Sequence, residues 1–179
     1  MLNMETKYED LIAFHGHSCP GLAIGYRMTN AALRFLSQQR AEDEELVAII
    51  ENNACGVDAL QFITGCTFGK GNLIFKDYGK HVFTLYSRQS RKGVRVVFDP
   101  IKIPEDIAED RDRLIEWLLS VAEKEIVLLE DVDIVEPEPA QIRASVKCDF
   151  CKESMMESRA EKIGDKLACM PCAKRLRGL

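Results

Sequence analysis

The sequence lacks the features that would place it in a membrane-bound, secreted or fibrous class. No stretch approaches the roughly 18 consecutive apolar residues of a membrane span. The N-terminal segment is charged and has no apolar region of the kind found in secretory signals. Internal repeats, low-complexity tracts and heptad patterns are also missing. These absences predict a soluble globular protein of the cytoplasm, with no membrane partner.

Disulfide bonds are not expected either. The chain has seven cysteines, an odd number, and four of them fall in C-x-x-C pairs. Such pairs are more typical of metal or redox sites in a reducing compartment than of a disulfide framework. At 179 residues the chain can bury a core without cross-links. Its length allows one domain, or one domain with a small module.

The distribution of charge and proline favours two units. Residues 141–179 hold nine Lys/Arg and five Asp/Glu, a net charge of +4, so residues 1–140 carry −9 of the overall −5. Glu136-Pro137-Glu138-Pro139 interrupts regular structure just before that change in composition. We therefore expect a domain over 1–140 with a Cys/His pocket, followed by a zinc-binding domain over 141–179.

Hydrophobic patterning predicts an α+β core with an antiparallel-rich sheet and helices. Because the expected strands cluster rather than alternate strictly with helices, a doubly wound fold is less favoured. The periodicities indicate helices over 5–13, 20–39, a short segment ending at 63, and 104–124. They indicate strands over 46–50, 73–76, 81–88, 94–98 and 128–135.

The C-terminal cysteines carry the strongest functional signal. Cys148 and Cys151 form one C-x-x-C pair, and Cys169 and Cys172 form a second after seventeen intervening residues. Two such knuckles supply the four thiolates of a tetrahedral zinc site. The segment between them is too poor in apolar residues for a core, so the metal would stabilise it. A knuckle, a hairpin and a knuckle opening a helix describe a treble-clef zinc finger; rubredoxin-type iron and a redox dithiol are the alternatives.

A second cluster lies near the N-terminus, in Phe14-His15-Gly16-His17-Ser18-Cys19-Pro20-Gly21. Proline suits the first position of a helix, which places Cys19 near the N-cap, where the helix dipole favours a thiolate. His15 and His17 would alternate on an extended segment and point to one side. Cys55, with Asp58 one turn later, repeats the pattern before a second helix. We expect His15, His17, Cys19 and Cys55 to ligate a metal, with Cys19, Cys55 and Asp58 as candidate catalytic residues; a buried, metal-free polar cluster is the alternative.

The glycine-rich loop Gly65–Asn72 fails as a nucleotide-binding P-loop. Three residues rather than four separate Gly65 from Gly69, and Gly71 instead of Ser/Thr follows the lysine. The loop can still fold over the same pocket and offer three candidate cofactor-binding residues, namely Cys66, Thr67 and Lys70.

Taken together, these motifs resemble the FmdE family, which is named after a component of formylmethanofuran dehydrogenase. The likeness rests on residues 15–21, 53–58 and 64–72, with the strand segment 80–88 and the four C-terminal cysteines, and it spans roughly residues 8–175. The resemblance implies an α+β core, an auxiliary treble-clef zinc finger, a homodimer and a pocket lined by the core cysteines and histidines. It also implies association with a molybdenum or tungsten enzyme of methanogenesis-related one-carbon metabolism.

Three classes of function are compatible with this resemblance. The first is an accessory or redox-associated subunit beside the larger enzyme, with a metal in the core pocket. The second is a metal- or ligand-sensing regulator that binds nucleic acid or protein through the zinc finger. The third is a protein that stores or delivers an ion.

Overall fold

The computed structural model describes residues 6–100 and 103–178. The chain forms two compact units, Met1–Ala140 and Gln141–Leu179. The first unit combines a mixed sheet with helices and the second holds two short hairpins and a helix, which confirms the mixed α and β class.

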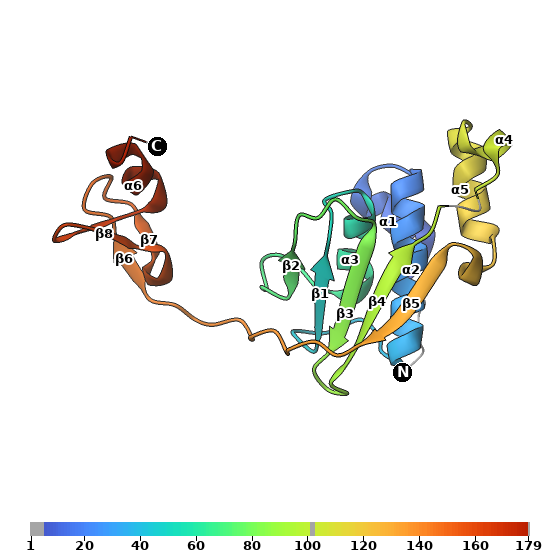
Figure 1. The fold of residues 1–179 in the computed structure, drawn as a ribbon, viewed down its shortest axis with the longest axis horizontal. Coiled ribbons are helices and arrows are strands. Elements are labelled where there is room, and N and C mark those ends of the chain that lie inside the picture. The colour runs from blue at the N-terminus through green and yellow to red at the C-terminus, as the bar shows by residue number, and fades with distance from the viewer. Residues whose placement is uncertain (1–5, 101–102, 179) are drawn as a thin grey trace. The chain divides into compact units, whose positions relative to one another are not determined.

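A five-stranded sheet forms the centre of the first unit (Figure 1). Its strands stand in the order β2-β1-β3-β4-β5, and every neighbouring pair is antiparallel except β1 and β2. The predicted antiparallel-rich sheet is therefore confirmed. The strands are β1 (Leu46–Ile50), β2 (Leu73–Phe75), β3 (Val82–Ser87), β4 (Lys92–Phe98) and β5 (Val127–Val132).

Helices supply the apolar residues that cover one face of this sheet. The long helix α2 packs against β3, β4 and β5, and α3 packs along α2. The largest side chains of the shared core are fully buried, among them Leu22, Met28, Leu60 and Leu85. Within the described residues, no helix combines the length and apolar character needed to cross a membrane. The helices are α1 (Tyr8–His15), α2 (Pro20–Leu36), α3 (Gly56–Thr64), α4 (Glu105–Ala108), α5 (Arg111–Ser120) and the 3-10 turn η1 (Glu123–Glu125).

Two predicted helices differ from those observed. The helix expected over 104–124 is interrupted, because the Asp110 side chain accepts hydrogen bonds from the backbone N–H groups of Asp112 and Arg113 and so starts a new helix. The helix expected to reach residue 39 ends at Leu36, where Ser37 takes a left-handed conformation with φ 52°.

Two glycines allow the backbones of α2 and α3 to touch. A Cβ atom on Gly25 would lie 2.3 Å from the carbonyl oxygen of Gly56, and a Cβ on Gly56 would lie 3.0 Å from the carbonyl oxygen of Gly21. Only glycine permits such an approach without displacing a backbone. Because the contact lies at the first turns of both helices, it also brings their N-terminal ends together.

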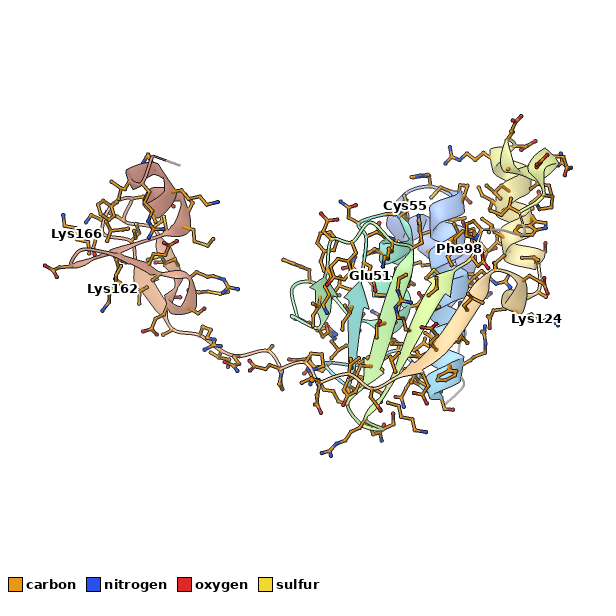
Figure 2. The ribbon with its side chains drawn as sticks, in the orientation of Figure 1. Glu51, Cys55, Phe98, Lys124, Lys162 and Lys166 are labelled. Atoms are coloured by element: carbon orange, nitrogen blue, oxygen red, sulfur yellow. The ribbon has the colours of Figure 1, made fainter. Side chains whose placement is uncertain are left out.

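The second unit consists of two short hairpins and a helix. β6 (Ser145–Lys147) pairs with β7 (Ser154–Met156), and β8 (Glu161–Ile163) pairs with β9 (Lys166–Ala168). A 3-10 turn η2 (Glu157–Arg159) separates the hairpins, and α6 (Met170–Leu176) ends the unit. Lys162 and Lys166 project from the β8–β9 hairpin into solvent (Figure 2). Among the described residues of this unit, the buried core consists of Cys148, Ala168, Cys172 and Ala173.

The contact between the two helices makes a prediction. Replacing Gly25 by Ala should lower the free energy of unfolding by roughly 1–3 kcal/mol, because the added methyl group meets backbone that cannot rotate away. Gly69→Ala is the matched control, since a Cβ there has nothing within 4 Å. Denaturant unfolding of both variants measures the difference. Equal stability of the two would show that the backbones do not touch.

Candidate metal centres and an adjoining pocket

The four C-terminal cysteines converge on one point. Their sulfur atoms all lie within 4.8 Å of one another, and the Cys151 and Cys169 sulfurs are 3.8 Å apart. Four sulfurs at about 2.3 Å from a tetrahedral zinc ion would be separated by about 3.8 Å. The residues therefore fit a tetrahedral thiolate site, and the predicted convergence of the two C-x-x-C pairs is confirmed.

Backbone groups stabilise negative charge in this four-cysteine cluster. Cys148 is buried, which opposes ionisation, yet N–H groups of Cys151, Cys169 and Phe150 lower the pKa of its thiol to about 6. The Cys169 N–H lies 3.3 Å from the Cys148 sulfur. Arg175 donates to the Cys172 sulfur at 3.4 Å. Both contacts favour the thiolate form that binds metal.

A second cluster forms where α1 meets α2. Ligand atoms of His15, His17 and Cys19 lie within 4.8 Å of one another. The prediction that His15 and His17 alternate on an extended segment is wrong: His15 is the last residue of α1, and Gly16 follows it with φ 98°. This left-handed turn folds the chain back, so the two imidazole rings still meet, with centroids 4.6 Å apart.

Cys19 occupies the N-cap of α2. Its backbone is extended, Pro20 follows at the first helical position, and its sulfur accepts a hydrogen bond from the Leu22 N–H at 3.3 Å. The predicted N-cap position is confirmed. The same sulfur lies 3.8 Å from Nε2 of His15, so both atoms can face one ion.

Asp58 holds His15 from the other side. Its Oδ2 lies 2.7 Å from Nδ1 of the imidazole. A carboxylate on one ring nitrogen fixes the orientation of the ring and directs the other nitrogen at the metal, as in many metal sites. Asp58, expected near a catalytic centre, thus acts on His15 from 43 residues away in the sequence.

Cys55 joins the cluster in a different environment from the one expected. It precedes α3, but its φ and ψ of −51° and −28° are already helical, and its side chain makes no capping hydrogen bond. Burial, and after it the neighbouring Cys19 thiol, raise the pKa of Cys55 above its ordinary value. The similarity of the two cysteines in sequence therefore does not extend to their chemistry.

The three loop residues lie outside this cluster. Cys66 is buried and donates to the carbonyl oxygen of Leu46 at 3.4 Å, and burial raises the pKa of its thiol to about 11. Lys70 donates from Nζ to the carbonyl oxygen of Asp43. Thr67 donates its N–H to Asn72. These hydrogen bonds attach the loop to the start of β1, so Cys66, Thr67 and Lys70 serve the loop's structure in this arrangement.

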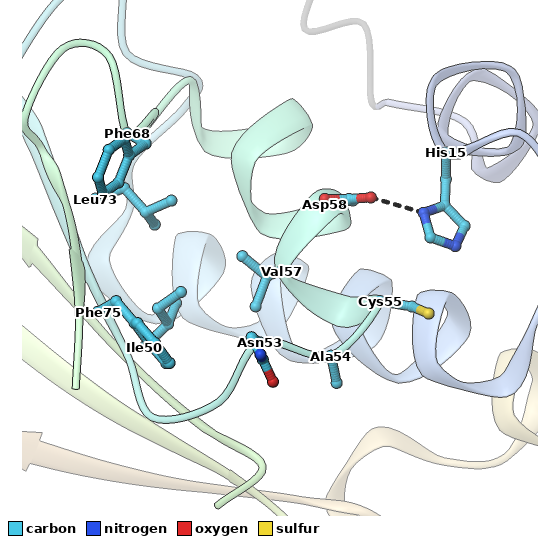
Figure 3. Close-up of a pocket in the computed structure, with 10 residues that line it drawn as sticks. All are labelled: His15, Ile50, Asn53, Ala54, Cys55, Val57, Asp58, Phe68, Leu73 and Phe75. Atoms are coloured by element: carbon cyan, nitrogen blue, oxygen red, sulfur yellow. Dashed lines mark hydrogen bonds and ion pairs between the residues drawn. The ribbon is translucent and has the colours of Figure 1, made fainter. Parts of the chain in front are cut away.

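A pocket of about 360 Å³ opens beside the N-terminal cluster (Figure 3). One wall is apolar and comes from β1, β2 and the glycine-rich loop, while the opposite side presents His15, Cys55 and Asp58. The lining residues are His15, Ile50, Asn53, Ala54, Cys55, Val57, Asp58, Phe68, Leu73 and Phe75.

Several of these residues carried no signal in the sequence. Phe68 and Phe75 read only as loop and strand residues, although Phe68 lies inside the glycine-rich loop that was expected to approach the pocket. Two further residues hold the motif from outside it. The Tyr8 hydroxyl lies 3.1 Å from the Ser18 hydroxyl, and Arg111 donates to the Ser18 carbonyl oxygen at 2.9 Å.

The fold and these clusters define a class: a two-unit α+β protein with a thiol–imidazole cluster in the first unit and a four-cysteine cluster in the second. The model of one family, described as "FmdE, Molybdenum formylmethanofuran dehydrogenase operon", matches residues 14–171. The chain therefore belongs to the FmdE family, as its motifs predicted.

Two relatives extend this comparison. The crystal structure of an FmdE-like protein of tungsten formylmethanofuran dehydrogenase, from Syntrophus aciditrophicus, is 28% identical, with a TM-score of 0.72 over 96% of this chain and 94% of that one. A protein of Archaeoglobus fulgidus, described as a probable S-adenosyl-L-methionine-binding protein, is 33% identical over 89% of this chain. The chain spans about half the length of that curated relative, 50%.

The four-cysteine cluster makes a prediction about metal content. Cys151→Ser should release one metal ion per chain and loosen the second unit, whose apolar core is too small to fold alone. Elemental analysis of purified protein measures the loss, and hydrogen exchange locates the loosened residues. Cys66→Ser, which alters a buried cysteine outside both clusters, should keep the full metal content. An unchanged metal content in Cys151→Ser would contradict the assignment.

Proposed function

We propose that this chain is a metal-binding accessory protein of the FmdE type, with a structural zinc ion in the second unit and a second metal ion in the first. The observation that carries the proposal is the convergence of His15, His17 and Cys19, which lie at a helix end, a turn and an N-cap. Three ligands of these types in one place are not required by packing.

Zinc in the four-cysteine cluster would stabilise the fold alone. Four thiolates complete a tetrahedron and leave no open position for water or substrate. The order of elements supports a treble-clef finger, since a knuckle after β6, the β8–β9 hairpin and a second knuckle at the start of α6 follow one another. Cys169 caps that helix and Cys172 lies in its first turn.

The core site would differ in having a position to spare. His15, His17 and Cys19 provide three ligands, and Cys55 supplies a second thiol beside Cys19. Imidazole and thiolate ligands suit zinc, nickel or copper better than magnesium or calcium. Such an ion supplies Lewis acidity or ligand sensing when bound. The chain's own contribution is to orient His15 through Asp58 and Cys19 through the N-cap of α2.

The family relationship supports the accessory role. The family is described by a molybdenum formylmethanofuran dehydrogenase operon, and the Syntrophus aciditrophicus relative by a tungsten enzyme of the same kind. We therefore infer that the chain acts beside a molybdenum or tungsten enzyme of methanogenesis-related one-carbon metabolism, as a cytoplasmic homodimer with a redox-associated or metal-holding task.

Metal stoichiometry tests the proposal. Wild-type protein reconstituted with cobalt(II) should bind two ions per chain and show thiolate-to-cobalt absorption from both sites. The His17→Ala/Cys55→Ser double variant should bind one, because it retains only His15 and Cys19 in the core. The variant Cys66→Ser should behave as wild type. A wild-type protein that binds one ion, lost on Cys151→Ser, would refute the core site and leave the structural zinc standing.

A regulatory role is the second candidate, favoured by the charge of the second unit. This unit carries a net charge of +4, and Lys162 and Lys166 stand exposed on its hairpin. In such a regulator the core would sense a metal or a small ligand, and the Archaeoglobus fulgidus relative, described as a probable S-adenosyl-L-methionine-binding protein, suggests one ligand to test. The basic unit would then bind nucleic acid through its phosphates.

Salt dependence decides whether that contact exists. If the full chain binds duplex DNA, Lys162→Ala/Lys166→Ala should weaken binding at every sequence and reduce the slope of log affinity against log salt by about two. Lys124→Ala, which removes an exposed lysine of the first unit, should leave the slope unchanged. Absence of any salt-dependent binding by the wild-type chain would remove this candidate.

A further inference from the structure

We propose that the pocket beside the core cluster binds a small organic cation, with its positive charge attached to an apolar body. This inference goes beyond metal binding and does not rest on it. It rests instead on the shape of the pocket, on the division of its lining into an apolar and a polar side, and on the sign of the charge that it presents.

The apolar side of the pocket fits a compact hydrophobic group. Its volume of about 360 Å³ is at the lower end of the range for small-molecule sites. Ile50, Leu73 and Phe75 form one wall, and Phe68 extends over it from the loop (Figure 3). Phe68 is 80% exposed and Phe75 44% exposed, so both rings have faces free to contact a ligand.

The polar side presents a carboxylate and no basic side chain. Asp58 is 40% exposed, and no Lys or Arg occurs among the described residues that line the pocket. His15 takes up Oδ2 of this carboxylate, whereas the contact of Oδ1 with the Gln61 amide is long, at 3.5 Å. Oδ1 can therefore accept from, or face, a positively charged group. Aromatic faces add attraction for the same charge, because the ring quadrupole is negative above the plane.

An anion is the strongest competing ligand, and the structure disfavours it. The N-terminus of α3 lies at the pocket and its dipole attracts negative charge. Asp58 already supplies that charge from the first turn of the same helix. A second negative group would therefore meet the carboxylate at close range, without a lysine or arginine from the lining residues to compensate.

Three matched probes test the inference on the full chain: benzyltrimethylammonium, benzyl alcohol and benzoate. They share an aryl body and differ in charge. A quaternary ammonium cannot coordinate a metal ion, so its binding reports on the pocket alone. Chemical shifts of backbone amides, followed during titration, locate each probe and give its affinity. We expect shifts at Ala54, Val57 and Leu73, with the cation bound more tightly than the alcohol and benzoate bound most weakly.

Substitutions then assign the charge recognition to named residues. Asp58→Asn should weaken the cation about fivefold without affecting benzyl alcohol. Phe75→Leu should also weaken the cation about fivefold, through loss of the ring face. Asp112→Asn is the matched control, because Asp112 is likewise an acidic residue in the first turn of a helix, α5, but does not line the pocket. It should change nothing.

The outcomes separate this inference from the metal proposal. The same titration on His17→Ala, a residue that does not line the pocket, should keep the preference for the cation even where the core metal is lost. Benzoate binding as tightly as the cation, a preference that survives Asp58→Asn, or an absence of shifts at pocket residues would each overturn the inference. A chain that binds only one metal ion but still prefers the cation would refute the core metal and support this site.

Discussion

The backbone contact between α2 and α3 is the constraint on which the candidate site depends. Gly25 and Gly56 let the two helices approach until backbone meets backbone. Side chains at these positions would separate the helices, and with them the residues that precede their first turns. Cys19 and Cys55 occupy those places, one at each helix N-terminus. A packing feature without polar groups thus determines whether two thiols can act together.

Within the site, similar sequence positions acquire different chemistry from small differences in backbone. Cys19 is extended, so its sulfur reaches the N–H of Leu22, whereas Cys55 is already helical and its sulfur makes no capping hydrogen bond to its own helix. Burial and the neighbouring thiol therefore raise the pKa of Cys55. His15 depends on tertiary structure as well, since the carboxylate that orients it comes from α3. The site is accordingly a product of three helix ends rather than of one motif.

The two metal-binding clusters show opposite relations between chain and site. In the second unit, two local knuckles bring all four sulfurs together, and the buried core consists largely of the ligands themselves. Metal binding and folding would then be one event. In the first unit, an extensive apolar core exists independently of any ion, and the cluster is placed at its edge. Loss of metal there would leave the fold, which is the condition for a site that exchanges ligands.

Much of this was accessible from the sequence, because it depends on local patterns. Spacing of Cys148, Cys151, Cys169 and Cys172 sufficed to predict their convergence, and Pro20 sufficed to place Cys19 at an N-cap. Alternating apolar residues likewise predicted the strands to within a few residues. The turn at Gly16, the helical backbone of Cys55 and the burial of Cys66 were not accessible, because each results from contacts between distant segments. The pocket belongs to the same group: Phe68 and Phe75 meet Asp58 only after β2 has paired with β1 and α3 has packed on α2, since neither pairing is encoded in the residues that form the walls.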